Sequence, residues 1–230
     1  MPTSYPVKLL KREVIAHDTL EFTLEKPPGF TYRAGQYGDL VLPESAGLGD
    51  ANKHGFSFAS APFEPTLRMA TRFRPSPFKL AAAKVPEGSM VELLALWGDF
   101  TLHKNTAIPA VFVIGGIGIT PVRSMLTQAL HDHTGHDLTL IYANRTQADA
   151  AYGAELTDLA RTHPNFHYFP IYTDISGRVD ANTLRAHIPN FATPRFYLAG
   201  PEGMVRAMRA LLIELNVDED SIRTEEFEGY

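Results

Sequence analysis

The chain has 230 residues, of which 44% are hydrophobic and 20% are charged, enough to bury one large core or two smaller ones. Its net charge of -5 argues against a general nucleic-acid or anionic-membrane binder. With no cysteine, the chain has no disulfide, no thiol chemistry and no cysteine ligand for an iron–sulfur cluster. We find no signal-peptide pattern and no apolar run of spanning length, so the expected location is the cytoplasm.

The first part of the chain, as far as Phe100, carries β-type patterns. Apolar and polar residues alternate over residues 19–25 and 67–73, and turns rich in proline and glycine separate further short runs. This spacing predicts an antiparallel β-barrel domain over residues 1–104. Further strands are expected at Tyr37–Leu42, Phe56–Ala59 and Met90–Leu96, with one helix at Phe78–Lys84.

Beyond residue 104, strand and helix patterns alternate. Such alternation predicts a parallel sheet covered by helices, an α/β domain over residues 105–230. The expected strand and helix pairs are Val111–Ile114 with Pro121–His131, Leu138–Ala143 with Glu155–Thr162, Phe166–Tyr172 with Ala181–His187, and Phe196–Ala199 with Met204–Leu215, followed by a last strand at Ile222–Phe227.

A glycine-rich turn, Gly115–Gly118, follows the first of these strands. Glycine lets the backbone approach a ligand, Thr120 suits a helix N-cap, and Pro121 suits the first helical position. This predicts phosphate binding at a helix N-terminus, the alternative being a tight turn without a ligand. Pro121 replaces the third glycine of the usual dinucleotide fingerprint, and no acidic residue follows the next strand, where Asn144 and Arg145 stand.

The segment from His54 to Ser57 resembles the Arg-x-Tyr-Ser signature of the ferredoxin–NADP reductase family of flavoproteins. With Gly115–Pro121 and Ala199-Gly200-Pro201, three motifs stand in the order found in that family. The resemblance covers nearly the whole chain. It implies a flavin-binding barrel followed by a NAD(P)-binding α/β domain, whereas taken alone the first segment is simply a barrel strand ending at Pro62.

On the flavin side, the resemblance implies that Phe56 packs on the isoalloxazine and that Ser57 bonds near flavin N5. His54 stands where the family has a phosphate-binding arginine, a change for which Lys53 or Arg72 would compensate. The implied cofactor is FAD rather than FMN. The further residues expected to bind it are Gly55, Arg72, Ser76, Phe78 and Lys79.

On the nicotinamide side, Ala199-Gly200-Pro201 resembles the family's Cys-Gly-Pro turn, with alanine replacing cysteine. Phe227 matches the near-terminal aromatic that covers the flavin, with Glu225 two positions before it, and Tyr230 is the alternative cap. Asp174 favours the unphosphorylated ribose of NADH over NADPH, with Arg145 and Arg178 as alternative phosphate partners. The residues expected to bind the nucleotide are Gly115, Gly116, Gly118, Ile119, Thr120, Pro121, Asn144, Arg145, Asp174, Ala199, Gly200, Pro201 and Met204, whereas Phe227 or Tyr230 is expected to cover the flavin.

These motifs together imply a flavin-dependent NAD(P)H reductase with Ser57, Glu225 and Phe227 at the hydride-transfer site. Its electrons would pass to a separate carrier such as a ferredoxin, a flavodoxin or an oxygenase component. The alternatives are an electron-transfer subunit of a larger complex, a reductase of free flavin, ferric chelates or quinones, and a nucleotide-binding regulator without flavin. His131, His133 and His136 are interpreted as cationic residues near a helix C-terminus rather than as metal ligands.

Overall fold

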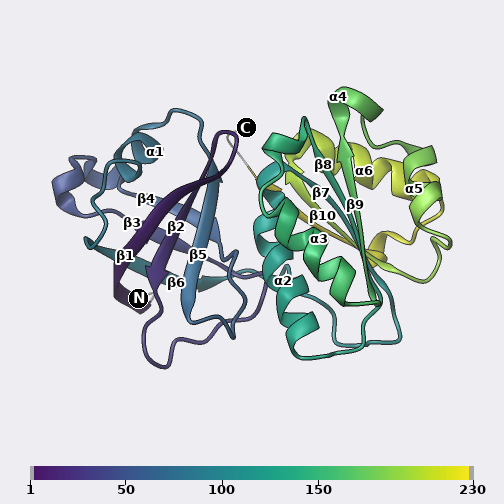
Figure 1. Ribbon diagram of the computed structural model, residues 1–230, viewed down its shortest axis with the longest axis horizontal. Coiled ribbons are helices and arrows are strands. Elements are labelled where there is room, and N and C mark those ends of the chain that lie inside the picture. Colours follow the sequence, from purple (N-terminus) through teal and green to yellow (C-terminus); the bar gives the residue numbers. More distant parts are fainter. Residues whose placement is uncertain (1–2, 228–230) are drawn as a thin grey trace. The chain divides into compact units, whose positions relative to one another are not determined.

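The computed structural model describes residues 3–227, apart from the side chains of residues 95 and 96. The chain forms two compact units (Figure 1). The first comprises the residues up to Thr101 together with Thr120–Gln128, and the second comprises Leu102–Ile119 and the residues from Ala129 onwards. A helical segment from the middle of the chain therefore belongs to the first unit, which we call the barrel unit; the second is the α/β unit.

The barrel unit contains a six-stranded antiparallel sheet in the order β4-β3-β6-β1-β2-β5. Phe58, the residue after the edge strand β4, forms an isolated bridge with Met69 on the other edge strand, β5, so the sheet is barrel-like but is not closed by a ladder of hydrogen bonds. The elements are β1 (Thr3–Ala16), β2 (Thr19–Glu25), β3 (Tyr37–Val41), β4 (Lys53–Ser57), β5 (Thr66–Arg72), α1 (Pro77–Ala82) and β6 (Met90–Trp97).

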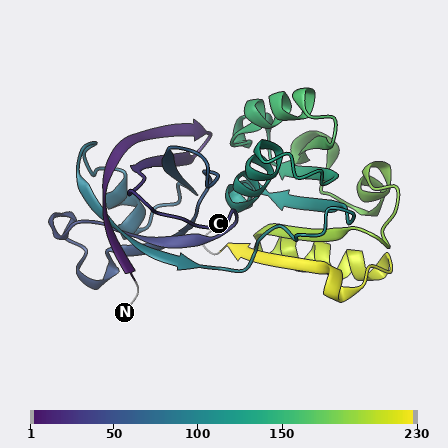
Figure 2. The same ribbon diagram turned by 90° about the horizontal axis from the view of Figure 1, so that it is seen from below.

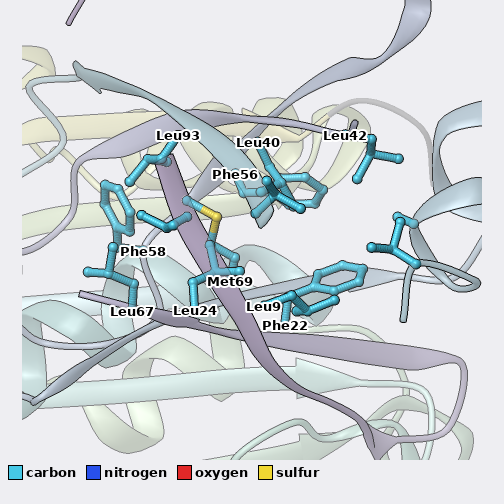
Figure 3. Packing of buried hydrophobic residues seen from close by; sticks show 14 of the residues in the cluster. Leu9, Phe22, Leu24, Leu40, Leu42, Phe56, Phe58, Leu67, Met69 and Leu93 are labelled. Atoms are coloured by element: carbon cyan, nitrogen blue, oxygen red, sulfur yellow. The ribbon is translucent and has the colours of Figure 1, made fainter. Parts of the chain in front are cut away.

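Alternation along the strands builds the core of the barrel unit. Phe22 and Leu24 on β2 point inward and are almost fully buried, as the pattern over residues 19–25 predicted. They pack with Phe56, Leu67 and other apolar residues inside the curved sheet (Figure 3). These inward-facing side chains fix the register of the strands that carry the candidate flavin residues.

The strand expected at Phe56–Ala59 was placed wrongly by about three residues, because β4 runs from Lys53 to Ser57. After Ser57 the chain leaves its ladder with β3. The N–H of Ala59 instead donates to the carbonyl of Arg68 on β5 at 2.7 Å. The segment after Ser57 is therefore held by contacts that local alternation does not encode.

The α/β unit contains a parallel five-stranded sheet in the order β11-β10-β7-β8-β9. Its strands alternate with helices along the chain, as predicted. The elements are β7 (Ala110–Gly115), η3 (Gly116–Gly118), α2 (Ile119–His131), β8 (Leu138–Asn144), α3 (Gly153–Thr162), β9 (Phe166–Tyr172), α4 (Thr173–Ser176), α5 (Ala181–His187), β10 (Arg195–Pro201), α6 (Glu202–Glu214) and β11 (Ile222–Phe227).

Helices lie on both faces of this sheet, so its central strands are apolar on both sides. Every residue of β7 is buried. Leu184 on α5 and Met208 on α6 pack against Val113 and neighbouring residues on one face, and α3 lies on the opposite face (Figure 2). No helix within residues 3–227 is long and apolar enough to cross a membrane.

Candidate functional site

The carboxyl ends of the parallel strands gather the nucleotide-binding candidates at one edge of the α/β unit. In the strand register, Gly115 pairs with Ala143, and Asn144, the next residue of β8, pairs with Tyr172. At the other end of the sheet, Pro201 pairs with Phe227. This edge is where open α/β sheets bind their ligands, because the helices that follow the strands begin there.

The glycine turn packs closely against β10. A Cβ atom on Gly118 would lie 2.5 Å from the backbone of Ala199, and a Cβ atom on Gly115 would collide with the side chain of Met204. Gly116 has φ 52°, in the left-handed region that favours glycine. Three of the predicted residues are thus glycine for reasons of conformation or packing.

The expected start of the following helix was wrong. Thr120 was predicted as the N-cap and Pro121 as the first helical residue, but the helical turn already begins within the glycines and α2 starts at Ile119. The positive φ of Gly116 allows the chain to turn into helix directly after β7. Pro121 lies in the first turn of α2, where backbone N–H groups lack intrahelical partners, so its ring is tolerated there.

The last described strand brings two further candidates to the same edge. β11 runs parallel to β10, which pairs Glu225 with Ala199 and Phe227 with Pro201. The side chains of alternate residues share a face of a strand, so Glu225 and Phe227 belong to the same face of β11. Tyr230, the alternative cap, lies outside the described residues.

A buried amide stands at the end of β8. Asn144 is 5% exposed, and neither its side-chain nitrogen nor its side-chain oxygen has a hydrogen-bond partner within residues 3–227. Such orphaned polar atoms are costly in an apolar interior, and a bound polar ligand is one way to satisfy them. Next to it, the N–H of Asp174 donates to the carbonyl of Arg145 at 3.1 Å, which brings these two candidates together.

In the barrel unit, three predicted flavin residues form an aromatic cluster. The ring of His54 lies 4.9 Å from that of Phe56 and 5.3 Å from that of Phe78, and the latter two rings are 6.0 Å apart. Phe56 and Phe78 are both buried in the barrel core, and the neighbouring Ser57 is 4% exposed. Gly55, between His54 and Phe56, is exposed. Stacking of Phe56 on a flavin stays a prediction.

Cationic groups surround this cluster. Burial, and then the charge of Arg74, lower the pKa of Lys79. Burial, and then the charge of Lys79, lower the pKa of His54, with only the carboxylate of Asp39 acting against them. The cations of Lys79 and Arg74 repel each other, and an anion such as a pyrophosphate would relieve that repulsion. The donor set therefore fits the phosphates of FAD.

The other predicted phosphate residues make contacts within the barrel unit. The Ser76 hydroxyl accepts from the Lys79 N–H at 3.2 Å and so caps α1. Lys79 Nζ donates to the carbonyl of Arg72, and Arg72 Nη1 donates to the carbonyl of His17. To bind phosphate, Ser76 and Arg72 would either use these contacts together with the phosphate or give them up for it. Their role in phosphate binding stays a prediction.

Two further residues, Tyr142 and Arg123, support the segments that carry the candidates and were not predicted from the sequence. The Tyr142 hydroxyl on β8 donates a hydrogen bond to the Gly116 carbonyl at 2.9 Å and so holds the glycine turn against β8. Arg123 on α2 is 2% exposed and pairs with Glu64. The available signals were the aromatic residue of β8, Tyr142, and an arginine among the apolar residues of α2. No cluster of three or more candidate metal ligands occurs in the described part of the chain.

The chain is similar in sequence to known oxidoreductases. Residues 112–210 match the family model for the oxidoreductase NAD-binding domain. The chain is 28% identical to a flavohemoprotein of Chromobacterium violaceum, over 96% of this chain and 60% of the relative. It is 25% identical to the reductase component of propane 2-monooxygenase of Mycolicibacterium goodii, over 96% of this chain and 68% of the relative.

The fold is shared with the FAD/NAD-binding domain of nitric oxide dioxygenase from Vibrio cholerae, with a TM-score of 0.84 and 22% identity over 96% of this chain and 98% of that one. The two units thus define the two-domain fold of flavoprotein reductases. The match over residues 112–210 and the two-domain fold are those found in ferredoxin–NADP reductase-like proteins, which this chain resembles. It spans 38% to 60% of the length of three curated relatives that it matches.

Proposed function

We propose that the chain is a flavin-dependent NAD(P)H reductase that takes hydride from nicotinamide and delivers electrons to a separate redox centre. The observation that carries the proposal is the strand register at the edge of the α/β unit. It sets Glu225 beside Ala199 and Phe227 beside Pro201, at the edge where the glycine turn ends β7. The resemblance to the reductase family assigns this turn, this acidic residue and this aromatic residue to the hydride-transfer site.

For the nucleotide, the turn at Gly116–Gly118 and the N-terminus of α2 provide the positive end of a helix for a pyrophosphate. The orphaned amide of Asn144 supplies donors and an acceptor on the adjoining strand. Glu225 contributes electrostatically beside Ala199 rather than as a general base, because hydride transfer needs little proton movement.

For the flavin, we assign the cluster of His54, Phe56 and Phe78 to the barrel unit's binding site, with Lys79 and Arg74 towards the phosphates. FAD, when bound, supplies a two-electron acceptor that can release electrons one at a time. The solved domain of the same fold from Vibrio cholerae is described as FAD- and NAD-binding, which supports this choice of cofactors.

We propose that the electron acceptor is a haem or iron–sulfur centre outside these 230 residues. The chain has no cysteine to ligate a cluster. Its relatives include a flavohemoprotein and a monooxygenase reductase component, whose names point to haem and oxygenase acceptors. A ferredoxin is one such iron–sulfur partner, and a flavodoxin is the alternative class of acceptor. A soluble cytoplasmic setting is part of the same proposal.

Anaerobic titration tests the function directly. The purified protein, loaded with FAD, is mixed with NADH and separately with NADPH while the flavin absorption band is followed. We expect bleaching by at least one nucleotide, with NADH the more effective. A protein that binds no FAD, or whose flavin neither nucleotide reduces, would contradict the proposal. Reduction of ferricyanide but not of cytochrome c or a ferredoxin would argue against a protein acceptor.

The role of Phe227 has its own test. We propose that its ring covers the flavin and moves aside for the nicotinamide, so Phe227→Ala should alter the rate of flavin reduction. The control is Ile222→Ala, at the far end of the same strand. Equal flavin reduction rates in the Phe227→Ala variant and the unmodified protein would show that Phe227 is not the cap.

A further inference from the structure

Four alternating charges form a continuous row within the barrel unit. Glu21 on β2 accepts from Arg68 Nε on β5 at 3.0 Å, and Arg68 Nη1 lies 3.7 Å from Glu64 Oε1. Glu64 also accepts from Arg123 on α2, with Nη1 to Oε2 at 2.8 Å and Nη2 to Oε1 at 3.1 Å. Two strands, a loop and a helical segment are thereby joined by ion pairs.

The Arg123–Glu64 pair is well buried, with side chains 3% and 17% exposed. Burial alone would raise the pKa of Glu64, but the hydrogen bond and charge of Arg123, with the N–H of Ala61 and the charge of Arg68, hold that pKa below its ordinary value. A buried ion pair adds little net stability over apolar residues, because both charges lose their hydration. What a two-pronged guanidinium contact does supply is a fixed orientation.

The same helical segment also holds the backbone that follows the flavin motif. Arg123 Nη1 donates to the Ala59 carbonyl at 2.7 Å, and the Ser124 hydroxyl donates to the Ser60 carbonyl at 2.6 Å. Ser60 is fixed further by the Tyr32 hydroxyl, 2.8 Å from its carbonyl. Ala59 and Ser60 follow Ser57 by only two and three residues, so these contacts set where β4 ends.

We propose that Arg123 is a positioning residue for the reductase reaction. Its fork on Glu64 and its bond to Ala59 fix α2 to the segment that carries Ser57. Because Thr120–Gln128 of α2 belongs to the barrel unit, this buried ion pair fixes the flavin motif within that unit. The inference rests on the proposed function. Arg123 acts through backbone and helix and touches no reacting atom.

Hydride transfer is the step that would reveal such a role, because its rate depends steeply on the placement of donor and acceptor, whereas equilibrium binding does not. The test variant is Arg123→Met/Glu64→Gln, which removes both charges together and leaves no buried ion unpaired. The matched control is Arg161→Met/Asp158→Asn, which removes an exposed ion pair on α3. Each protein is examined for its Kd for FAD, its thermal midpoint, and its anaerobic flavin reduction by stopped flow.

We expect the limiting rate of flavin reduction to fall by about tenfold or more in the test variant, as a displacement of less than 1 Å would produce. The Kd values for FAD and for nicotinamide nucleotide should change by less than about threefold, and the control should match the unmodified protein. Arg123→Lys keeps the charge but loses the two-pronged contact with Glu64. It should therefore also lower the limiting rate with little change in the Kd values, but by a smaller factor.

A limiting rate within about twofold of the unmodified protein, in either Arg123 variant, would overturn the positioning role. So would parallel losses of rate and FAD affinity, which indicate a merely structural contact. If the double variant does not fold, the Arg123→Lys result decides. If the unmodified protein binds FAD but is reduced by neither nucleotide, the proposed function fails instead, which separates the two outcomes.

Discussion

A Cβ atom on Gly118 would lie 2.5 Å from both the carbonyl carbon and the carbonyl oxygen of Ala199. Backbone atoms cannot swing away as the end of a long side chain can. The same close approach is seen at Gly200 on β10. Its φ is 150°, and an added Cβ atom would lie 2.9 Å from the Gly115 carbonyl oxygen. The two turns therefore approach each other as closely as they do because side chains are missing from both.

Gly118→Ala should destabilise the protein by about 1–3 kcal/mol, the usual range for overpacking a tight core position. It should also weaken nicotinamide nucleotide binding, because the turn must shift away from β10. Thermal unfolding and nucleotide titration measure the two effects. The control is Gly203→Ala on α6, where an added Cβ meets nothing within 4 Å. An unchanged thermal midpoint in Gly118→Ala would show that the turn relaxes freely.

His54→Arg should raise the affinity for FAD by about tenfold, equivalent to about 1.4 kcal/mol. The pKa of His54 is lowered by burial and by Lys79, so the imidazole is neutral near pH 7 and adds no charge for a phosphate. Arginine is always charged and binds phosphate through two donors. The Kd for FAD, obtained by quenching of flavin fluorescence, gives the measurement.

The same substitution should lower the thermal midpoint of the FAD-free protein, because a further cation is placed beside Lys79 and Arg74. Opposite signs for the two effects distinguish phosphate recognition from a general gain in stability. Lys8→Arg, an exposed exchange on β1, is a control for adding an arginine elsewhere. Unaltered FAD affinity in His54→Arg would place the phosphates away from residue 54.

A histidine network at the start of the α/β unit predicts a pH dependence. His103 lies with Nδ1 2.9 Å from the Tyr197 hydroxyl and Nε2 2.8 Å from the Ile108 carbonyl. Burial lowers the pKa of His103 below 6.5, with the charges of His136, Arg195 and Arg223 in the same direction and the bond to Ile108 opposing them. The folded protein therefore favours the neutral ring.

Because the pKa of His103 is lower in the folded than in the unfolded chain, the unfolded chain binds more protons near pH 6. The free energy of unfolding should then fall as the pH drops below about 6.5, and this contribution is fully present above that value. Thermal midpoints between pH 5 and pH 7.5 test it. His103→Gln should flatten the slope, and His133→Asn, at an exposed turn, should not. An unaltered slope in His103→Gln would assign it to other groups.

The sequence predicted the fold well wherever one periodicity dominates. Residues 19–25 alternate and form β2, and the all-apolar run before Gly115 forms the buried strand β7. The ends of elements were less predictable, because they depend on contacts outside the local pattern. Ala59 lies beyond the end of β4 and donates to the carbonyl of Arg68. The 3-10 turn before α2 lies within the glycines and depends on the left-handed Gly116.

The motifs of the candidate site could be predicted from the sequence, but the relative positions of their residues could not. Glu225 and Phe227 could be assigned to a last strand, while their register beside Ala199 and Pro201 follows from sheet pairing. The role of Arg123 could not be predicted from the local sequence, because its partner Glu64 is 59 residues away along the chain. A charged residue within an apolar stretch can be read from sequence, but the identity of its buried partner cannot.

Discrimination between NADH and NADPH offers a last test of the edge of the sheet. Asp174 is the second residue of α4, which directly follows β9. Its N–H donates to the Arg145 carbonyl, so both residues stand at the carboxyl ends of the strands. A carboxylate there favours a ribose hydroxyl and repels a 2′-phosphate. Asp174→Ser should therefore raise kcat/KM for NADPH relative to NADH by about tenfold, or about 1.4 kcal/mol. Asp158→Ser on α3 removes the same charge elsewhere and should leave the ratio alone. If both variants keep the original ratio, other residues bind the adenosine end. The next residue to substitute is then Asn144, whose buried amide has no hydrogen-bond partner among the residues that the structure describes.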